Sequence, residues 1–289
     1  MGLTTGTGPL GRNPAGTFNF DPPESGKAMY IEPSPKRVRV VVNGRTVADS
    51  RSVKLLHEAG HQPVYYLPAQ DVDPQYLRPS DRSTHCPKKG DASYHSIEVG
   101  ERLIENGAWY YPDPIAGAEP IKGMIAFYWS RMDSWLEEDE EVFVHPRDPY
   151  HRVDILESDR DIKISLNGEL LAHTQRPTAL FESNLPTRWY MPLEDIVADL
   201  EPSELITACP YKGKASYHKV RLSTGEIVED LVWCYQDPIA DASRIAHLHC
   251  FYDERVDVDI DGERQSRPDT VWSTKGGRAS NLPPAHTRG

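Results

Sequence analysis

Thr84-His85-Cys86-Pro87-Lys88-Lys89-Gly90-Asp91-Ala92-Ser93-Tyr94-His95 occurs a second time, as Thr207-Ala208-Cys209-Pro210-Tyr211-Lys212-Gly213-Lys214-Ala215-Ser216-Tyr217-His218. The two copies lie 209 − 86 = 123 positions apart. The match extends outward at an offset of 167 − 43 = 124, from Asn43-Gly44 against Asn167-Gly168 to Phe127-Tyr128 against Phe251-Tyr252. A match of this length, with only single-residue slips, indicates an internal duplication.

The duplication predicts two domains, each of a size that usually encloses one core. We expect the first repeat domain at residues 29–144 and the second at 161–262, joined by a linker at 145–160. Residues 1–28 are rich in Gly, Pro and Thr and predict a flexible N-terminal tail, and residues 263–289 predict a disordered C-terminal tail. The acidic run Glu137 to Glu141 is typical of a solvated linker.

Secondary structure is expected to be mostly strand. The β-branched runs at 38–42 and 162–166 both end in Asn-Gly, a strong hairpin signal, and the run at 256–260 ends in Asp-Gly. Short helical turns are expected at 69–72 and 193–197, each behind a proline. The fold class is therefore mainly β, with two similar small curved β-sheet or barrel domains in tandem and few short helices.

Composition limits the function. The net charge of −12 disfavours nucleic acid, because phosphate contacts need clustered Lys and Arg. No run of about 20 apolar residues is present, which disfavours a membrane span. Four cysteines are too few for a disulfide scaffold, and the N-terminal sequence lacks a signal-peptide pattern, so we expect a soluble cytoplasmic protein with reduced thiols. The expected partner is a small molecule; the oligomeric state stays open.

The repeated Cys-Pro-x-Lys-Gly turn is the first candidate for chemistry. Lys89 is suited to hold an anionic group, and a thiol at Cys86 near Lys89 and His95 would have a lowered pKa. Strand alternation places His95 on the face opposite Tyr94. The second copy repeats this set with Cys209, Lys212, Tyr217 and His218. The alternative is a structural turn with a buried cysteine.

The repeated Trp-x-Tyr-x-Asp-Pro segment is the second candidate. Alternation places Trp109, Tyr111 and Asp113 on one strand face, as an aromatic wall that ends in a carboxylate. Such a wall is suited to line a pocket, and equally to fill a core. The second copy has Trp233, Tyr235 and Asp237 at these places.

A zinc site would have to come from residues that are mostly specific to the second copy. These residues are Cys209, Cys234, His247, His249 and Cys250. Singly packed histidines and cysteines are the commoner arrangement, so we expect no metal and no cofactor.

The chain resembles, twice over, the family labelled domain of unknown function 427. The resemblance covers about residues 29–262 and rests on these stretches: Met29-Tyr30-Ile31-Glu32-Pro33-Ser34-Pro35-Lys36-Arg37-Val38-Arg39, Val47-Ala48-Asp49-Ser50, Pro63-Val64-Tyr65-Tyr66-Leu67-Pro68, Thr84-His85-Cys86-Pro87-Lys88-Lys89-Gly90, Tyr111-Pro112-Asp113-Pro114 and Asp139-Glu140-Glu141-Val142-Phe143-Val144-His145-Pro146-Arg147-Asp148-Pro149-Tyr150. It implies a small all-β fold of the barrel or β-tent kind, with the linker as part of the tandem pattern. It implies no particular reaction.

We therefore expect an uncharacterised tandem-repeat protein that binds a small anionic or carbonyl-bearing molecule in a pocket of each domain, built from the turn and the strand, with or without catalysis. The candidate ligand-binding residues are Lys89, Tyr94, Trp109, Tyr111, Lys212, Tyr217, Trp233 and Tyr235. The candidate catalytic residues are Cys86, His95, Asp113, Cys209, His218 and Asp237. The alternative is a non-catalytic protein-interaction module with two docking surfaces.

Overall fold

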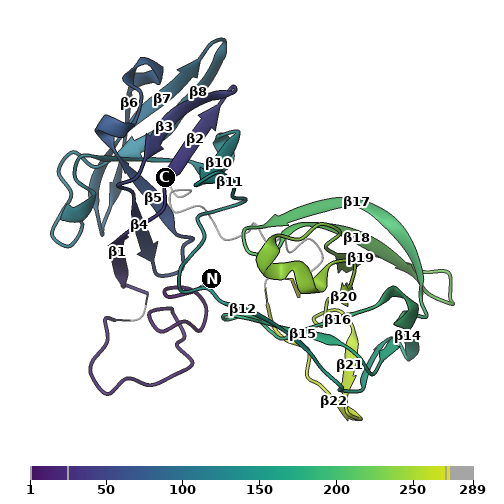
Figure 1. The fold of residues 1–289 in the computed structure, drawn as a ribbon. Coiled ribbons are helices and arrows are strands. Elements are labelled where there is room, and N and C mark those ends of the chain that lie inside the picture. The colour runs from purple at the N-terminus through teal and green to yellow at the C-terminus, as the bar shows by residue number, and fades with distance from the viewer. Residues whose placement is uncertain (1, 25, 271, 274–289) are drawn as a thin grey trace. The chain divides into compact units, whose positions relative to one another are not determined.

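The computed structural model describes residues 2–24, 26–270 and 272–273, and its contacts divide the chain into two units between Asp148 and Pro149. Strands β1 to β11 belong to the first half and β12 to β22 to the second, from purple to yellow in Figure 1. All helices of the described residues are short 3-10 helices. None of them is long and apolar enough to cross a membrane.

The first half contains eleven strands and four 3-10 helices. In chain order they are β1 (Met29–Pro33), β2 (Val38–Val42), β3 (Arg45–Ser50), β4 (Lys54–Glu58), β5 (Val64–Pro68), η1 (Ala69–Asp71), η2 (Pro74–Tyr76), β6 (Leu77–Cys86), β7 (Gly90–Val99), β8 (Arg102–Tyr110), η3 (Glu119–Ile121), β9 (Met124–Phe127), η4 (Trp129–Arg131), β10 (Ser134–Glu137) and β11 (Glu140–Glu141).

The second half repeats this order with two 3-10 helices. Its elements are β12 (Val153–Glu157), β13 (Ile162–Leu166), β14 (Glu169–Thr174), β15 (Thr178–Glu182), β16 (Arg188–Met191), η5 (Leu193–Asp195), β17 (Asp199–Cys209), β18 (Gly213–Arg221), β19 (Ile227–Cys234), η6 (Ala240–Ile245), β20 (His249–Phe251), β21 (Asp257–Ile260) and β22 (Glu263–Arg264).

Each half consists of a seven-stranded and a four-stranded antiparallel sheet. The strand orders are β1-β4-β5-β9-β8-β7-β6 with β11-β10-β2-β3 in the first half, and β12-β15-β16-β20-β19-β18-β17 with β14-β13-β21-β22 in the second. The two halves have corresponding strand orders, which confirms the duplication. Both sheets are open in the described pairings, so a closed barrel or tent is not confirmed.

The predicted hairpins are confirmed. Asn43 and Gly44 join β2 to β3 with φ values of 48° and 67°, and Asn167 and Gly168 join β13 to β14 with 54° and 85°. Both residues lie in the left-handed region that a type I′ hairpin turn requires, which Asn and Gly reach at low cost. The expected short helical turns are also present, as η1 and η5.

Strand alternation gives the seven-stranded sheet two apolar faces. In β5, Tyr65 joins the core shared with the four-stranded sheet, whereas Tyr66 joins a second core on the opposite face. In β16, Trp189 and Tyr190 divide in the same way. The sheet therefore lies between two layers of side chains, which is why its central strands β5 and β9 read as nearly continuous apolar runs.

Residues expected to be linker or tail make several contacts. The backbone N–H of Arg147 donates to Glu137, whose carboxylate also accepts from the Tyr65 hydroxyl, so Glu137 is buried rather than solvated as the acidic run predicted. The strand β12 occupies part of the expected linker. Near the N-terminus, the carbonyl of Thr4 accepts a hydrogen bond from the backbone N–H of Gly60. Most of the expected C-terminal tail lies outside the described residues.

Candidate functional site

The Cys-Pro-x-Lys-Gly segments form equivalent hairpin turns in the two halves. In the first, the backbone N–H of Lys89 donates to the Cys86 carbonyl, and the Lys89 carbonyl accepts from Ile115. Gly90 has a φ of +97°, and a β-carbon there would lie 3.3 Å from the carbonyl oxygen of Asp113. Glycine is therefore needed both for the backbone angle and for the close approach of the next loop. Gly213 repeats this geometry with a φ of +100°.

The lysine of each turn is already neutralised by a buried carboxylate. Lys89 is 1% exposed and forms an ion pair with Glu58, and Lys212 does the same with Glu182. Burial alone would raise the pKa of Glu58, but the Lys89 ammonium outweighs burial and holds that pKa below its usual value. These lysines therefore serve an internal ion pair, which argues against their use as an anion site.

The predicted aromatic wall forms the second core of each half. Trp109 Nε1 donates to the Tyr66 hydroxyl at 3.2 Å, and Trp233 Nε1 donates to the Tyr190 hydroxyl at 2.9 Å. Tyr94, Tyr111 and Cys86 pack in the same cluster as Trp109, and Tyr217 and Tyr235 pack with Trp233. The structure brings these candidates together within a packed apolar layer.

The other candidates lie apart from that layer. His95 stacks on Tyr110 at 4.9 Å between ring centroids, on the face opposite Tyr94. The Asp113 side chain is 90% exposed and pairs with Lys122 at 2.9 Å. In the second half, Asp237 is also exposed, whereas the rings of His218 and His249 lie 5.2 Å apart. The histidines and aspartates therefore do not converge as an acid–base pair.

Burial opposes ionisation of the thiols of Cys209 and Cys234 in the second half. Burial raises the pKa of Cys209 and raises the pKa of Cys234 to about 11. His247 hydrogen-bonds Gln236 through Nδ1 at 2.9 Å. Within the described ranges, three or more His, Cys, Asp or Glu side chains do not gather as a metal site, so the candidates Cys209, Cys234, His247, His249 and Cys250 do not meet.

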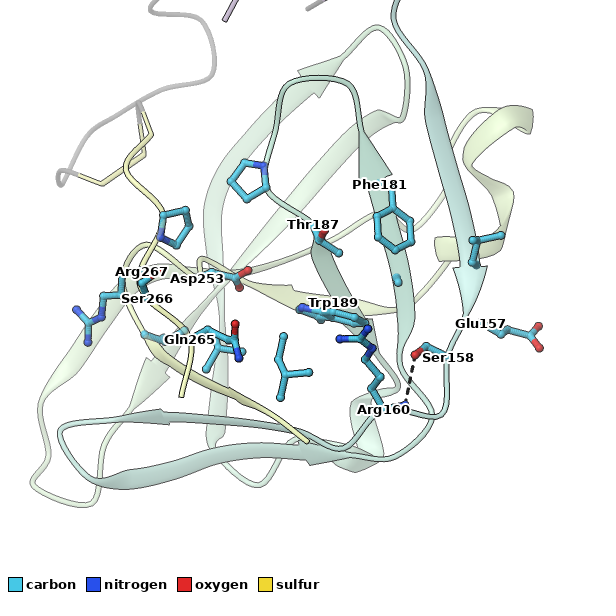
Figure 2. A pocket seen from close by; sticks show the side chains of 17 residues that line it. Glu157, Ser158, Arg160, Phe181, Thr187, Trp189, Asp253, Gln265, Ser266 and Arg267 are labelled. Atoms are coloured by element: carbon cyan, nitrogen blue, oxygen red, sulfur yellow. Dashed lines mark hydrogen bonds between the residues drawn. The ribbon is translucent and has the colours of Figure 1, made fainter. Parts of the chain in front are cut away.

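A cavity of about 480 Å³ lies between the two sheets of the second half, and none of the sequence-predicted site residues lines it (Figure 2). Its lining combines apolar side chains, most of them from β12, β15, β16 and β21, with polar and charged side chains such as Arg160, Asp253 and Arg267. The residues used below are Leu156, Ala179, Phe181, Trp189, Val256 and Val258. The size and apolar lining are typical of a pocket for a small organic molecule.

A buried group of three charges borders this cavity. Arg188 makes a bidentate ion pair with Glu254, with N–O distances of 2.9 and 2.6 Å. Asp253, which lines the cavity in Figure 2, has its Oδ2 3.7 Å from Arg188 Nη1 and a side chain that is 13% exposed. Burial raises the pKa of Asp253 to about 7, although the Arg188 guanidinium opposes this shift. A buried carboxyl of this kind in a cavity marks a functional-site candidate.

Among the described residues, the equivalent place in the first half has neither these three charges nor a cavity of this size. At the offset of 124, Val64 replaces Arg188, Trp129 replaces Asp253 and Ser130 replaces Glu254. Trp129 stacks on Trp135 with centroids 4.4 Å apart and the rings 4° from parallel. The corresponding hollow, lined by Tyr65, Trp129 and Trp135 among others, has only about 40 Å³. One copy thus fills the space that the other copy keeps open.

The motifs that the two copies share lie away from this cavity, so they do not point to it. The sequence signal lies where the copies differ: Arg188, Asp253 and Glu254 are charged, whereas Val64, Trp129 and Ser130 at the matching positions are not.

Asp253 makes stability depend on pH in a defined direction. Its folded-state pKa of about 7 lies above the ordinary 3.8, so its contribution is fully present below pH 3.8 and is lost as pH rises through 7. We expect Asp253→Asn to be more stable than the unmodified chain at pH 8 by about 1 kcal/mol or more. The difference should shrink toward pH 4. Urea unfolding at both pH values measures it, and an unchanged difference would refute the assignment.

Comparison with known families identifies the repeat. The family model described as a domain of unknown function (DUF427) matches residues 30–138 and again residues 154–262. These matches span most of both sheets in each half. A search of curated proteins finds no match for this chain.

Proposed function

We propose, from the premise that this chain belongs to the DUF427 family and carries its domain twice, that the second half binds a small organic molecule in the cavity beside Asp253. The observation that carries the proposal is that an open cavity and a buried group of charges lie side by side in the second half. A cavity of about 480 Å³ and the trio of Arg188, Asp253 and Glu254 occur in one copy, and the other copy replaces them with Trp129 and its neighbours.

Energetics support a functional reason for the trio. Buried ion pairs are seldom worth more than apolar side chains of similar volume, because desolvation offsets their attraction. The first half shows that the fold tolerates Val64, Trp129 and Ser130 at these positions. Keeping three charges there, beside an open cavity, is therefore more than the fold itself requires.

The apolar walls define the kind of ligand. Trp189 and Phe181 offer aromatic surface, and Leu156, Val256 and Val258 offer aliphatic surface. Such walls favour a ligand with a flat apolar body through burial of its surface. We place the ligand here and not at Lys89 or Lys212, because Glu58 and Glu182 already hold those ammonium groups.

A cavity-filling substitution tests the proposal. Ala179 lines the cavity, and its counterpart in the first half is Leu55. We expect Ala179→Leu to abolish the binding of small-molecule hits found with the unmodified chain, because the new side chain occupies their space. A thermal-shift screen of an organic fragment library, read again with the variant, makes the measurement.

Two controls complete the test. Native mass spectrometry of the freshly purified chain shows any molecule that is retained, as a mass excess lost on denaturation. Leu55→Ala, which changes the matched position of the first half, should leave the hits bound. Hits that bind Ala179→Leu unchanged, or a screen without hits, would refute the cavity as the binding site.

A further inference from the structure

The trio beside the cavity carries more negative than positive charge. With both carboxylates ionised, Arg188 supplies one positive charge and Asp253 and Glu254 supply two negative charges. Glu254 holds the guanidinium through two short hydrogen bonds and accepts a third bond from the Thr270 hydroxyl at 2.6 Å. Asp253 is the carboxylate left at the longer distance of 3.7 Å, on the side of the cavity.

We propose that the cavity takes a cationic ligand, a protonated amine on a flat apolar body, with the ammonium group against Asp253 and the body against Trp189. This inference rests on the proposed function and names the ligand class for the same site. A buried carboxylate whose nearest cation is 3.7 Å away gains strongly from a closer one, because a charge-assisted hydrogen bond replaces the water that burial removed.

Charges at the rim do not provide that cation. Arg267 pairs with Asp257 at 2.8 Å, and Glu157 pairs with Arg244 at 3.3 Å. These groups are matched among themselves, and the side chains of Arg267 and Glu157 are 47% and 87% exposed.

Arg160 shows that the aromatic wall accepts a cation. Its guanidinium lies over the Trp189 ring, with the central carbon 5.8 Å from the ring centroid, and Figure 2 shows the two side chains together. Its carboxylate neighbour, Asp261, is 4.0 Å away. A ring quadrupole attracts cations in this geometry, so Trp189 and Asp253 favour the same sign of charge in a ligand.

The groups that face Asp253 set the direction of the pH dependence. They are Arg188 on β16, Glu254 on the same loop and the thiol of Cys250 on β20, whose own pKa burial raises well above its ordinary value. Arg188 stays charged and Cys250 stays neutral near pH 7, so Asp253 is the group that titrates there. A bound cation displaces its proton, and affinity for the cation should rise between pH 6 and pH 8.

A cationic ligand has the opposite charge to the ligand expected from the sequence. Lys89 and Lys212 suggested an anionic or carbonyl-bearing molecule, but each lysine is matched by its own glutamate. Among the charged side chains that line the cavity, Asp253 is the buried one, and its charge favours the opposite sign.

Three indole probes of nearly equal size and different charge test the inference on the full chain. They are tryptamine, indole-3-acetamide and indole-3-acetate, measured by isothermal titration calorimetry at pH 8. We expect tryptamine to bind at least about tenfold more tightly than the amide, and the acetate to bind most weakly. At pH 6 the advantage of tryptamine should fall, and its binding should release protons to the buffer.

Asp253→Asn is the discriminating variant, since it keeps the shape and removes the charge. It should lose the preference for tryptamine while retaining the amide. Asp199→Asn, an exposed change on β17, is the matched control and should bind all three probes as the unmodified chain does.

The outcomes separate the two proposals. Tighter binding of the amide or the acetate, or a tryptamine preference that survives in Asp253→Asn, would overturn the cationic ligand and leave the cavity as a binding site. Absence of binding by all three probes would also overturn it. The fragment screen with Ala179→Leu then decides the proposed function independently.

Discussion

Lys89→Met should destabilise the first half by about 3–5 kcal/mol, which is enough to lower its unfolding midpoint sharply. The substitution keeps the length and apolar character of the side chain but removes the ammonium group. Glu58, only 6% exposed, then loses its principal buried cation. Lys88 lies 3.3 Å from the other carboxylate oxygen and is partly exposed, so it compensates only in part. Guanidinium unfolding of the variant and the unmodified chain measures the difference.

Two companion variants show whether the buried charge is the cause. Glu58→Met combined with Lys89→Met removes both charges and should recover most of the loss, because apolar replacement of a whole buried pair is often neutral. Lys122→Met removes an exposed lysine, 62% accessible, from its pair with Asp113 and should cost less than about 1 kcal/mol. A loss for Lys89→Met as small as that for Lys122→Met would refute a structural role for the pair.

Arg188→Met should destabilise the second half by a similar amount, about 3–5 kcal/mol at pH 8. It leaves Asp253 and Glu254 buried together without their cation. Protonation relieves both carboxylates as pH falls, so the loss should be smaller at pH 5 than at pH 8. Unfolding curves at the two pH values, followed by circular dichroism, give the result.

Copying residues of the first half into the second should restore the stability that Arg188→Met loses. Arg188→Val, Asp253→Trp and Glu254→Ser together copy the residues found at Val64, Trp129 and Ser130 and remove all three charges. The triple variant should be at least about as stable as the unmodified chain and should bind no ligand in the cavity. A loss for Arg188→Met that does not change with pH would contradict the charge argument.

Many strands and turns of the fold can be predicted from local sequence patterns, which occur once in each half. The Asn-Gly turns and the β-branched runs before them predict β2, β3, β13 and β14, because those dipeptides reach the left-handed turn conformation easily. The opposite faces of Tyr65 and Tyr66 follow from strand alternation alone. The pairing of strands into two open sheets in each half depends on long-range contacts, which local sequence patterns do not predict.

The candidate site was harder to predict for a physical reason. A lysine in a shared turn gives the same sequence signal whether it faces a ligand or a buried glutamate, and here Lys89 and Lys212 meet Glu58 and Glu182. The partner is 31 positions from Lys89 and 30 from Lys212, so the ion pair exists only in the fold. Glu137 was misjudged likewise, because a run of acids does not show which member is buried.

The cavity exists because two of its lining residues are smaller than their counterparts in the first half. It is open where Asp253 stands in place of Trp129 and where Ala179 stands in place of Leu55. Differences in side-chain volume and charge between the repeats mark these positions in the sequence. This comparison needs the register of the repeats, which the sequence supplies, and knowledge that these positions border one space, which the structure supplies.

The most direct test of the account is the ¹⁵N indole spectrum of the six tryptophans as tryptamine is added to the full chain at pH 8. The signal of Trp189 should shift with saturation, those of Trp129 and Trp135 should stay in place, and Asp253→Asn should need at least about tenfold more tryptamine for the same shift. A Trp189 signal that does not move, or one that moves equally in Asp253→Asn, would contradict a cation site in the second half.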